Sequence, residues 1–230
     1  MQKQVAIIGL GRFGVGLANT LLGMGYDVLA LDVDEGRVQA VASQVSRAIH
    51  ADATDEAVLR GLGIDKFDVA IVSMGSDIEH SVLTTILLRK LGVPLIVSRA
   101  DNELHGSILE KIGAHKVVYP EREMGVRVAH GLTLTDVLDY MSVDPSYGVA
   151  KMTPPSTFVG RTLYELGLGP EGQWEVAVLL IKREREIIVS PDRMEVVSPG
   201  DILIVSGNDV RLEELLAEAR KPRNVEDEEE

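Results

Sequence analysis

The chain has 230 residues, of which 45% are hydrophobic and 26% charged, and its formal net charge is −13 with no cysteine. This length allows one large domain or two smaller ones with ordinary cores. The lack of cysteine excludes disulfides, thiolate metal sites and a cysteine nucleophile. The acidic balance argues against binding to nucleic acid or directly to anionic lipid.

Hydropathy argues against a membrane span. No apolar run approaches the roughly 20 residues that a helix needs to cross a bilayer. We therefore expect a soluble chain without direct membrane insertion, and the absence of cysteine fits a reducing, cytoplasmic location. The first apolar run leads into a glycine loop, which is typical of a buried strand and not of a signal peptide. Any work at a membrane would require a partner that holds the chain there.

The first half of the chain alternates short apolar runs with helical patterns. Strands are expected over 4–10, 27–32, 47–52, 68–75, 94–100 and 115–120. Helices are expected between them, over 12–24, 35–44, 55–62, 77–91 and 102–112. Apolar strands separated by helices indicate an α/β fold, a Rossmann-like doubly wound parallel sheet covered on both faces.

A long helical pattern with many apolar residues follows over 121–141. Two interpretations stay open: the helix packs on its own sheet, or it crosses to a second subunit. Residues 142–147 are expected to form a turn and linker, which ends a first lobe over 1–140.

The remainder predicts a small α+β lobe over 145–220. Its expected elements are a strand over 147–154, a short helical turn within 157–168, three strands within 174–207, and a closing amphipathic helix over 208–221. Asn208 or Asp209 is expected to cap that helix. The acidic stretch over 221–230 is expected to be a disordered, solvated tail.

Gly9, Gly11 and Gly14 form a GxGxxG loop between a strand and a helix. Gly9 permits the tight turn, Gly11 lets backbone approach a pyrophosphate, and Gly14 lets the helix pack close to the strand. Asp32 ends the second strand, where its carboxylate can accept hydrogen bonds from ribose hydroxyls and would repel the 2′-phosphate of NADP. The pattern predicts a nucleotide site; the alternative is a purely structural glycine turn.

Charged residues near this loop favour a ligand with phosphates. Arg12 lies within the loop, and Arg99 follows the fifth strand. A guanidinium gives bidentate contacts to phosphate oxygens, although Arg12 could also be merely solvated. Glu121 opens the long helix, where it either meets phosphates through a bridging metal ion or is only a favourable N-terminal charge.

Two further segments complete the candidate site. Asp52, Ala53 and Thr54 follow the third strand, where they can meet the adenine edge. Thr54 or its neighbour Asp55 can also cap the next helix. Met74 and Gly75 belong to the run SMGSD after the fourth strand, at the crevice where the strand order reverses.

Signals for catalysis are weak. Tyr147 and Lys151 spell YxxxK, a pair that short-chain dehydrogenases place on a helix, but this stretch is strand-like. In a strand the two residues lie about 13 Å apart. The five histidines show no metal-ligand spacing. We therefore expect a protein that is not an enzyme, with an NAD-dependent oxidoreductase as the alternative.

Several segments resemble the regulator of potassium conductance (RCK/KTN) family, in particular the cytosolic gating subunits of Trk/Ktr-type potassium uptake. They are VAIIGLGRFG, LALDVDEGRV, HADATDEAVL, DVAIVSMGSD and LEKIGAHKVVYPEREMG. The likeness covers about 1–140 as the RCK N-lobe and about 145–220 as the RCK C-lobe. It implies a homodimer that assembles into an octameric ring, docked under an integral-membrane potassium transporter subunit and thus peripheral to the cell membrane.

The resemblance also implies ligands. It predicts exchange of ATP and ADP in the N-lobe, with NAD(H) as a further ligand of relatives. It makes Arg12 a phosphate contact and Asp32 a ribose contact. It places Glu121 near the nucleotide phosphates of a neighbouring subunit, together with Mg²⁺ or another cation.

Other positions match less closely. Phe13 completes the GLGRFG motif, Arg99 stands where relatives usually carry lysine, and Asp34 stands where some have asparagine near the ribose or base. Some relatives bind cyclic di-AMP at the C-lobe dimer interface, but no specific residue of this chain supports the same site here. A nucleotide-dependent regulator of a non-transporter partner stays a further alternative.

Overall fold

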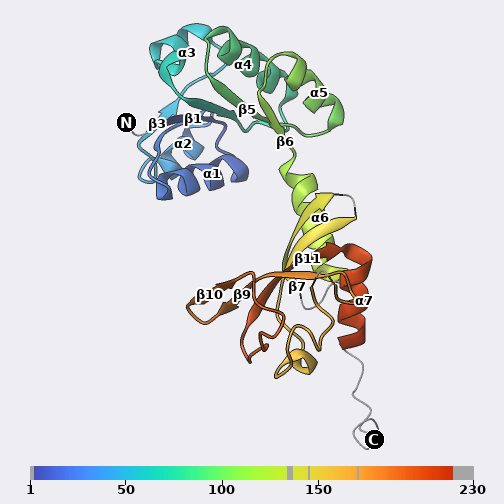
Figure 1. Ribbon diagram of the computed structural model, residues 1–230. Helices are drawn as coiled ribbons and strands as arrows, with labels where there is room; N and C mark the ends of the chain where they lie inside the picture. The colour runs from blue at the N-terminus through green and yellow to red at the C-terminus, as the bar shows by residue number, and fades with distance from the viewer. Residues whose placement is uncertain (1–2, 134–136, 145, 170, 220–230) are drawn as a thin grey trace, which may run out of the picture. The chain divides into compact units, whose positions relative to one another are not determined.

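The computed structural model describes residues 3–133, 137–144, 146–169 and 171–219. The chain divides into two compact units, residues 1–122 and 123–230, each with its own sheet (Figure 1). The expected boundary near residue 140 lies within the second unit, inside a strand. No helix of the described residues is long and apolar enough to cross a membrane.

The first unit contains the predicted parallel sheet, with strand order β3-β2-β1-β4-β5-β6. Its strands are β1 (Gln4–Ile8), β2 (Asp27–Asp32), β3 (Arg47–His50), β4 (Val69–Val72), β5 (Leu95–Arg99) and β6 (Lys116–Val118). All six lie where the sequence predicts them. The order reverses between β1 and β4, and this switch point is where doubly wound sheets bind ligands.

Helices cover both faces of this sheet. They are α1 (Arg12–Gly23), α2 (Glu35–Val41), α3 (Glu56–Gly61), α4 (Ile78–Lys90) and α5 (Glu103–Lys111), with a 3₁₀ turn, η1 (Ile64–Lys66). Figure 1 shows α1 and α2 on one face and α3, α4 and α5 on the other. Side chains that accept backbone N–H bonds start α2 to α5: Asp34, Asp55, Asp77 and Asn102.

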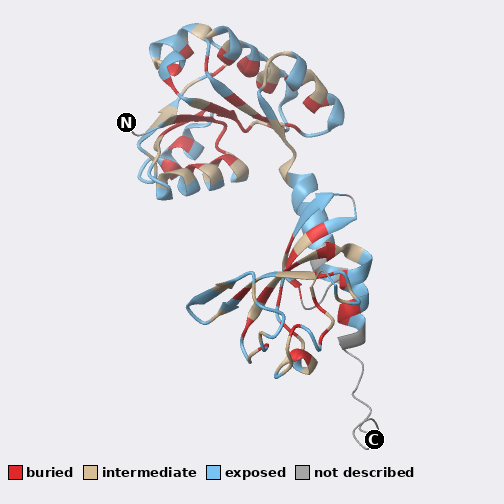
Figure 2. Cartoon of the chain, in the orientation of Figure 1, coloured by how far each residue is buried: buried red, intermediate tan, exposed pale blue. Residues whose placement is uncertain are grey.

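Alternation along the strands builds a core on each side of the sheet. Ile7 packs with the α1 and α2 face, and its neighbour Ile8 packs with the opposite face. Both are fully buried, as are most residues of the central strands (Figure 2). Burial on both faces explains why these strands are continuous apolar runs.

The helix expected over 121–141 is shorter than predicted. Helix α6 spans Pro120–Thr133, and Val137–Asp144 forms strand β7, which pairs antiparallel with β8 (Tyr147–Met152). The predicted helix is therefore wrong for 137–141, and the predicted turn and linker over 142–147 is wrong for 142–144 and for Tyr147, which belong to the two strands. The physical reason is tertiary: β8 supplies backbone partners, and Val137 and Tyr140 enter the second core.

The second unit is an antiparallel sheet of order β10-β9-β11-β8-β7 with one closing helix. Its other elements are η2 (Ser156–Phe158), β9 (Ala177–Arg183), β10 (Glu186–Val189), β11 (Ile202–Asn208) and α7 (Asp209–Ala219). The predicted α+β lobe and its closing helix are confirmed. Asn208 accepts the N–H of Val210 at 3.0 Å, as expected of a cap. The tail over 221–230 lies outside the described residues.

A buried carboxylate ties strand β9 to the turn before β11. Arg183 donates from Nε to Asp201 Oδ1 and from Nη2 to Asp201 Oδ2, both at 2.9 Å. Ser198 N–H adds a third bond to Asp201 at 2.8 Å, and the Asp201 side chain is fully buried. Burial raises the pKa of this carboxyl, but the hydrogen bonds from Arg183 and Ser198 outweigh it and lower the pKa.

Candidate functional site

The glycine loop requires glycine at its first and last positions. Gly9 has φ +97°, and a Cβ there would lie 2.7 Å from Met74 Cγ. A Cβ on Gly14 would collide with the carbonyl oxygen of Gly9 and lie 2.7 Å from Ser73 Oγ. Gly11 differs, because no atom of the described chain lies within 4 Å of a Cβ built there. The two outer glycines therefore serve the fold, whereas Gly11 leaves open space for a ligand.

The N-terminus of α1 offers free donors to an anion. Gly11 is the N-cap residue; no described side chain caps the helix, and its first turn holds no acidic residue. Arg12 is exposed and forms no hydrogen bond or ion pair with any residue that the structure describes. Phe13 is half-buried beside it. The backbone N–H groups, the helix dipole and Arg12 together favour negative charge at this point.

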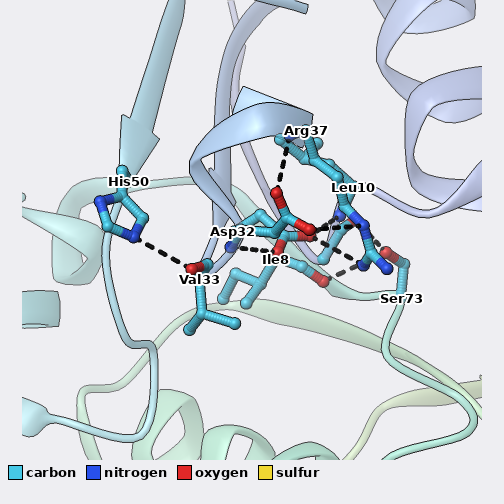
Figure 3. Close-up of polar contacts among 9 residues, drawn as sticks. Ile8, Leu10, Asp32, Val33, Arg37, His50 and Ser73 are labelled. Carbon is cyan, nitrogen blue, oxygen red and sulfur yellow. Dashed lines mark hydrogen bonds and ion pairs between the residues drawn. The ribbon is translucent and has the colours of Figure 1, made fainter. Parts of the chain in front are cut away.

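Asp32 contacts the loop directly, which the sequence does not predict. Leu10 N–H donates to Asp32 Oδ2 at 2.6 Å, and Asp34 N–H donates to Asp32 Oδ1 at 2.9 Å (Figure 3). Only 4% of the side chain is exposed. A carboxylate has about four acceptor positions, so a ribose would have to use those that the two N–H groups leave.

Arg37 also lies beside Asp32 and Asp34, and the sequence analysis did not identify it. Its Nη1 lies 3.6 Å from Asp32 Oδ2, and its Nε lies 3.7 Å from Asp34 Oδ2. Asp34 also caps α2 by accepting the N–H of Arg37 at 3.2 Å. His50 Nε2 lies 3.0 Å from the carbonyl oxygen of Val33, which ties β3 to the end of β2 (Figure 3). The spacing of three residues between Asp34 and Arg37 could have indicated that their side chains lie close together.

The strand ends beyond the switch point bring Gly75, Arg99 and Glu121 together. A Cβ on Gly75 would lie 2.6 Å from Arg99 Nε, so the backbone of Gly75 packs against the guanidinium. Arg99 Nη2 donates to Glu121 Oε1 at 2.6 Å. Arg99 is 18% exposed, and its Nε is buried with no hydrogen-bond partner among the described residues. This N–H is a donor that a phosphate oxygen could satisfy as acceptor.

The segment after β3 is partly explained by local structure. Asp52 Oδ1 accepts bonds from Thr54 Oγ1 at 2.7 Å and Thr54 N–H at 2.8 Å, and these bonds lower the Asp52 pKa. Ala53 is buried. The cap of α3 is Asp55, not Thr54. The adenine contact of Asp52 and its neighbours stays a prediction.

The charge pattern near α4 raises a histidine pKa. His80 Nδ1 lies 2.8 Å from Asp77 Oδ2. The hydrogen bond and charge of Asp77, helped by Asp52, raise the pKa of His80.

Two further candidates from the sequence were a metal site and the YxxxK pair. No group of three or more His, Asp or Glu side chains in the described ranges could hold a metal ion. A cation at Glu121 would therefore need ligands from phosphates or a second subunit. Tyr147 and Lys151 both lie on strand β8, opposite Asn208 and Ile204 of β11. The predicted strand conformation of this stretch is confirmed.

Comparison with known families finds two matching domains. The TrkA-N domain matches residues 5–120, and the TrkA-C domain matches residues 149–220. The chain is 41% identical over 191 residues to Ktr system potassium uptake protein C of Bacillus subtilis, covering 83% of this chain and 86% of that protein. It is 38% identical over 189 residues to Ktr system potassium uptake protein A of the same organism, covering 82% and 84%.

Solved structures share the fold at low sequence identity. The RCK domain of GsuK superposes with a TM-score of 0.65 at 16% identity, covering 97% of this chain and 49% of that chain. The GsuK channel bound to NAD gives a TM-score of 0.62 at 16% identity, covering 97% and 41%. This chain thus spans about half the length of those proteins or less.

Proposed function

Because the chain belongs to the family of potassium uptake proteins that combine a TrkA-N with a TrkA-C domain, we propose that it is a cytosolic, nucleotide-binding regulatory subunit of a potassium uptake system. An integral-membrane transporter subunit of the Trk/Ktr type would hold it at the cell membrane. Its role would be to gate that subunit and not to catalyse a reaction.

The proposed ligand is ATP or ADP, with NAD(H) as an alternative. One observation carries this choice: the unpaired Arg12 stands at an uncapped helix N-terminus after β1, and Arg99 ends β5 of the same parallel sheet, so both belong to the edge where the strands end. Loop N–H groups already satisfy a dinucleotide pyrophosphate. A terminal phosphate gains more from added guanidinium groups, since it carries more charge. The remaining expected contacts are ribose at Asp32 and Asp34 and the base near Asp52, Ala53 and Thr54.

The proposed signal is the third phosphate. A triphosphate would engage Arg12 and, through Mg²⁺ or another cation, Glu121 of a neighbouring subunit, whereas a diphosphate would leave that contact incomplete. A ligand shifts a conformational equilibrium only by its differential affinity for the two states. Within one chain Glu121 pairs with Arg99, so a phosphate arriving at Arg99 would compete for the same guanidinium and release Glu121 for such a contact.

Exposed apolar side chains support assembly into the expected homodimer and octameric ring. Helix α6 exposes Met124, Val126, Val128 and Leu132, and α4 exposes Ile78, Leu83 and Ile86. Met124, Val128 and Leu132 recur every four residues and therefore share one face of α6, and an exposed apolar face is typical of an interaction site. The helix that crosses to a second subunit is therefore the interpretation we adopt for α6.

Ligand titration tests the proposal. The full chain would be titrated with ATP, ADP, NADH and cyclic di-AMP, with and without Mg²⁺, and followed by thermal unfolding and by particle size in solution. A ligand that binds the folded state raises its melting temperature by mass action. We expect ATP and ADP to stabilise the chain, and only ATP with Mg²⁺ to change the ring. Turnover of NADH with small carbonyl compounds would instead support an oxidoreductase.

Co-purification distinguishes the proposed function from the remaining alternative, a nucleotide-dependent regulator of a non-transporter partner. A tagged chain should retain an integral-membrane potassium transporter subunit from detergent extracts, in a nucleotide-dependent manner. Retention of a different partner with no transporter would favour a regulator of some other system.

A further inference from the structure

We propose that Asp32 and Ser73 are positioning residues that hold the phosphate loop, residues 9–14, in its binding shape. Each would govern phosphate affinity without touching a phosphate. The inference rests on the proposed nucleotide site and adds a second role for Asp32 and a first role for Ser73. Figure 3 shows both side chains beside the loop.

Asp32 holds the loop from the β2 side. Its Oδ2 accepts the N–H of Leu10, which lies between Gly9 and Gly11, at 2.6 Å. The bond is buried, and Asp32 exposes 4% of its side chain. Hydrogen bonds to an ionised, buried acceptor are among the stronger ones in proteins. The carboxylate therefore fixes one peptide of the loop while exposing little surface to a ligand.

Ser73 holds the loop from the β4 side. Its hydroxyl donates to the carbonyl oxygen of Gly9, with a second contact to the carbonyl oxygen of Ile8 at 3.1 Å. Ser73 is 3% exposed, and it fills the space that a Cβ on Gly14 would need. The same side chain thus meets the strand end, the loop and the first turn of α1.

Asp32 and Ser73 contact the loop from the two strands that flank β1. Strand β1 pairs with β2 on one side and with β4 on the other. Asp32 is the last residue of β2, and Ser73 directly follows the last residue of β4. The peptide N–H of Leu10 and the peptide carbonyl of Gly9 are both occupied, so this part of the loop cannot rotate freely. A preorganised set of N–H groups binds an anion without first losing conformational entropy.

The two roles of Asp32 make different predictions, and probes that carry only one part of a nucleotide separate them. Inorganic tripolyphosphate has no ribose, and adenosine has no phosphate. A residue that only contacts ribose affects adenosine alone, whereas a residue that shapes the loop affects tripolyphosphate.

The test uses the full chain with Asp32→Asn and Ser73→Ala, titrated with tripolyphosphate by calorimetry and with adenosine by NMR. Asparagine keeps the shape but turns one acceptor into a donor that faces an N–H. We expect Asp32→Asn to bind tripolyphosphate about tenfold more weakly, the scale of one hydrogen bond to a charged group, and Ser73→Ala several-fold more weakly, since its bond joins neutral groups. Ser73→Ala should leave adenosine binding unchanged.

Matched variants control for general damage. Asp27→Asn changes the carboxylate at the other end of β2, which accepts Gln4 Nε2 at 3.0 Å. Ser81→Ala removes a fully buried hydroxyl of α4 that has no partner among the described residues. Both should bind tripolyphosphate as the unaltered chain does.

Three outcomes overturn the inference or its basis. Loss of adenosine binding alone in Asp32→Asn would leave Asp32 a simple ribose ligand, and normal tripolyphosphate binding by Ser73→Ala would remove the second positioning residue. If thermal unfolding shows that the Asp32→Asn chain is not folded, the tripolyphosphate affinity of Ser73→Ala tests the inference instead. If the unaltered chain binds none of ATP, ADP, NADH and tripolyphosphate, the proposed nucleotide function itself fails.

Discussion

Arg99 Nη2 lies 2.6 Å from Glu121 Oε1, so an ion pair joins the end of strand β5 to the first turn of helix α6. The two partners differ in environment: 18% of the Arg99 side chain is exposed, against 67% of Glu121. Arg99 is held in place by Gly75, whereas Glu121 reaches over it from solvent. A phosphate at Arg99 would therefore displace Glu121 and not the arginine.

Glu121→Gln should change how magnesium affects ATP binding. The glutamine keeps the side-chain length but removes a charge that repels phosphate, worth about 1 kcal/mol at 4 Å in water. ATP should bind a few-fold more tightly without Mg²⁺, and Mg²⁺ should add less than it does for the unaltered chain. Calorimetry with and without Mg²⁺ measures both, with Glu110→Gln on α5 as the control. An undiminished magnesium effect would exclude Glu121 from the cation site.

Arg12→Ala should weaken ATP binding more than NADH binding. Removal of a guanidinium that meets a terminal phosphate costs about 1.5–3 kcal/mol, or roughly tenfold or more in affinity. NADH should lose less, because the loop N–H groups hold its pyrophosphate. The control is Arg60→Ala, whose guanidinium pairs with Glu56 on α3 at 2.8 Å. Equal losses for the two ligands would remove the idea that Arg12 detects the third phosphate.

Two glycines of α1 should respond to alanine in opposite ways. Gly14→Ala forces a methyl group against the carbonyl oxygen of Gly9 and should cost about 1–3 kcal/mol of unfolding free energy, as overpacking does. Gly16 is exposed with no atom within 4 Å of a Cβ, so Gly16→Ala should stabilise by up to about 1 kcal/mol. Denaturant unfolding gives both values. Equal effects would mean that the close approach at Gly14 is not what the fold requires.

Gly11→Ala should separate binding from stability. The residue has φ −69°, and its Cβ would point into open space, so the unfolding free energy should change by less than about 0.5 kcal/mol. A methyl group there would occupy the space that a phosphate needs, and ATP affinity should fall steeply. Normal ATP binding by a stable Gly11→Ala chain would move the phosphates away from this loop.

Arg183→Ala should destabilise the second unit by about 3–5 kcal/mol, because it leaves the fully buried Asp201 without its cation. Arg185→Ala, in the exposed turn after β9, is the matched control. Unfolding should be followed for each unit, since two units need not unfold together.

Acid should reveal the same contact. The Asp201 pKa lies below its ordinary value of 3.8 in the folded state, so its stabilisation is complete above that pH and is lost as the pH falls through the folded value. Arg183→Ala should abolish this part of the acid dependence. An acid profile identical to that of the unaltered chain would contradict the assignment.

The sequence predicted the first unit well because its signals are local. Each strand is a continuous apolar run, and helix caps such as Asp34, Asp77 and Asn102 stand directly before their helices. Three glycines and one strand-end aspartate also locate the glycine loop and the strand end beside it without knowledge of the fold.

The prediction failed at 137–141 because its signal was ambiguous. Val137 and Tyr140 are three residues apart, a spacing that a helix face also shows. What decides for a strand is pairing with β8 and the bond from Tyr140 Oη to Asp209 Oδ1 at 2.5 Å, with Asp209 far along the chain. A local sequence pattern does not predict contacts between residues so far apart in the chain.

The candidate site was incomplete for a related reason. Ser73 belongs to the run SMGSD, in which the sequence analysis singled out only Met74 and Gly75. Its contact with Gly9 depends on the register of two parallel strands, in which Ile8 lies opposite Val72. The pairs Arg37 with Asp32 and Arg99 with Glu121 likewise depend on which strand ends lie side by side.

The bond between Leu10 N–H and Asp32 gives this molecule a built-in reporter. A buried, charge-assisted bond of 2.6 Å should shift the Leu10 amide proton far downfield in NMR spectra and slow its exchange with solvent. No label or partner protein is needed to observe it. The resonance would follow the shape of the loop in any state of assembly that the spectrum can resolve.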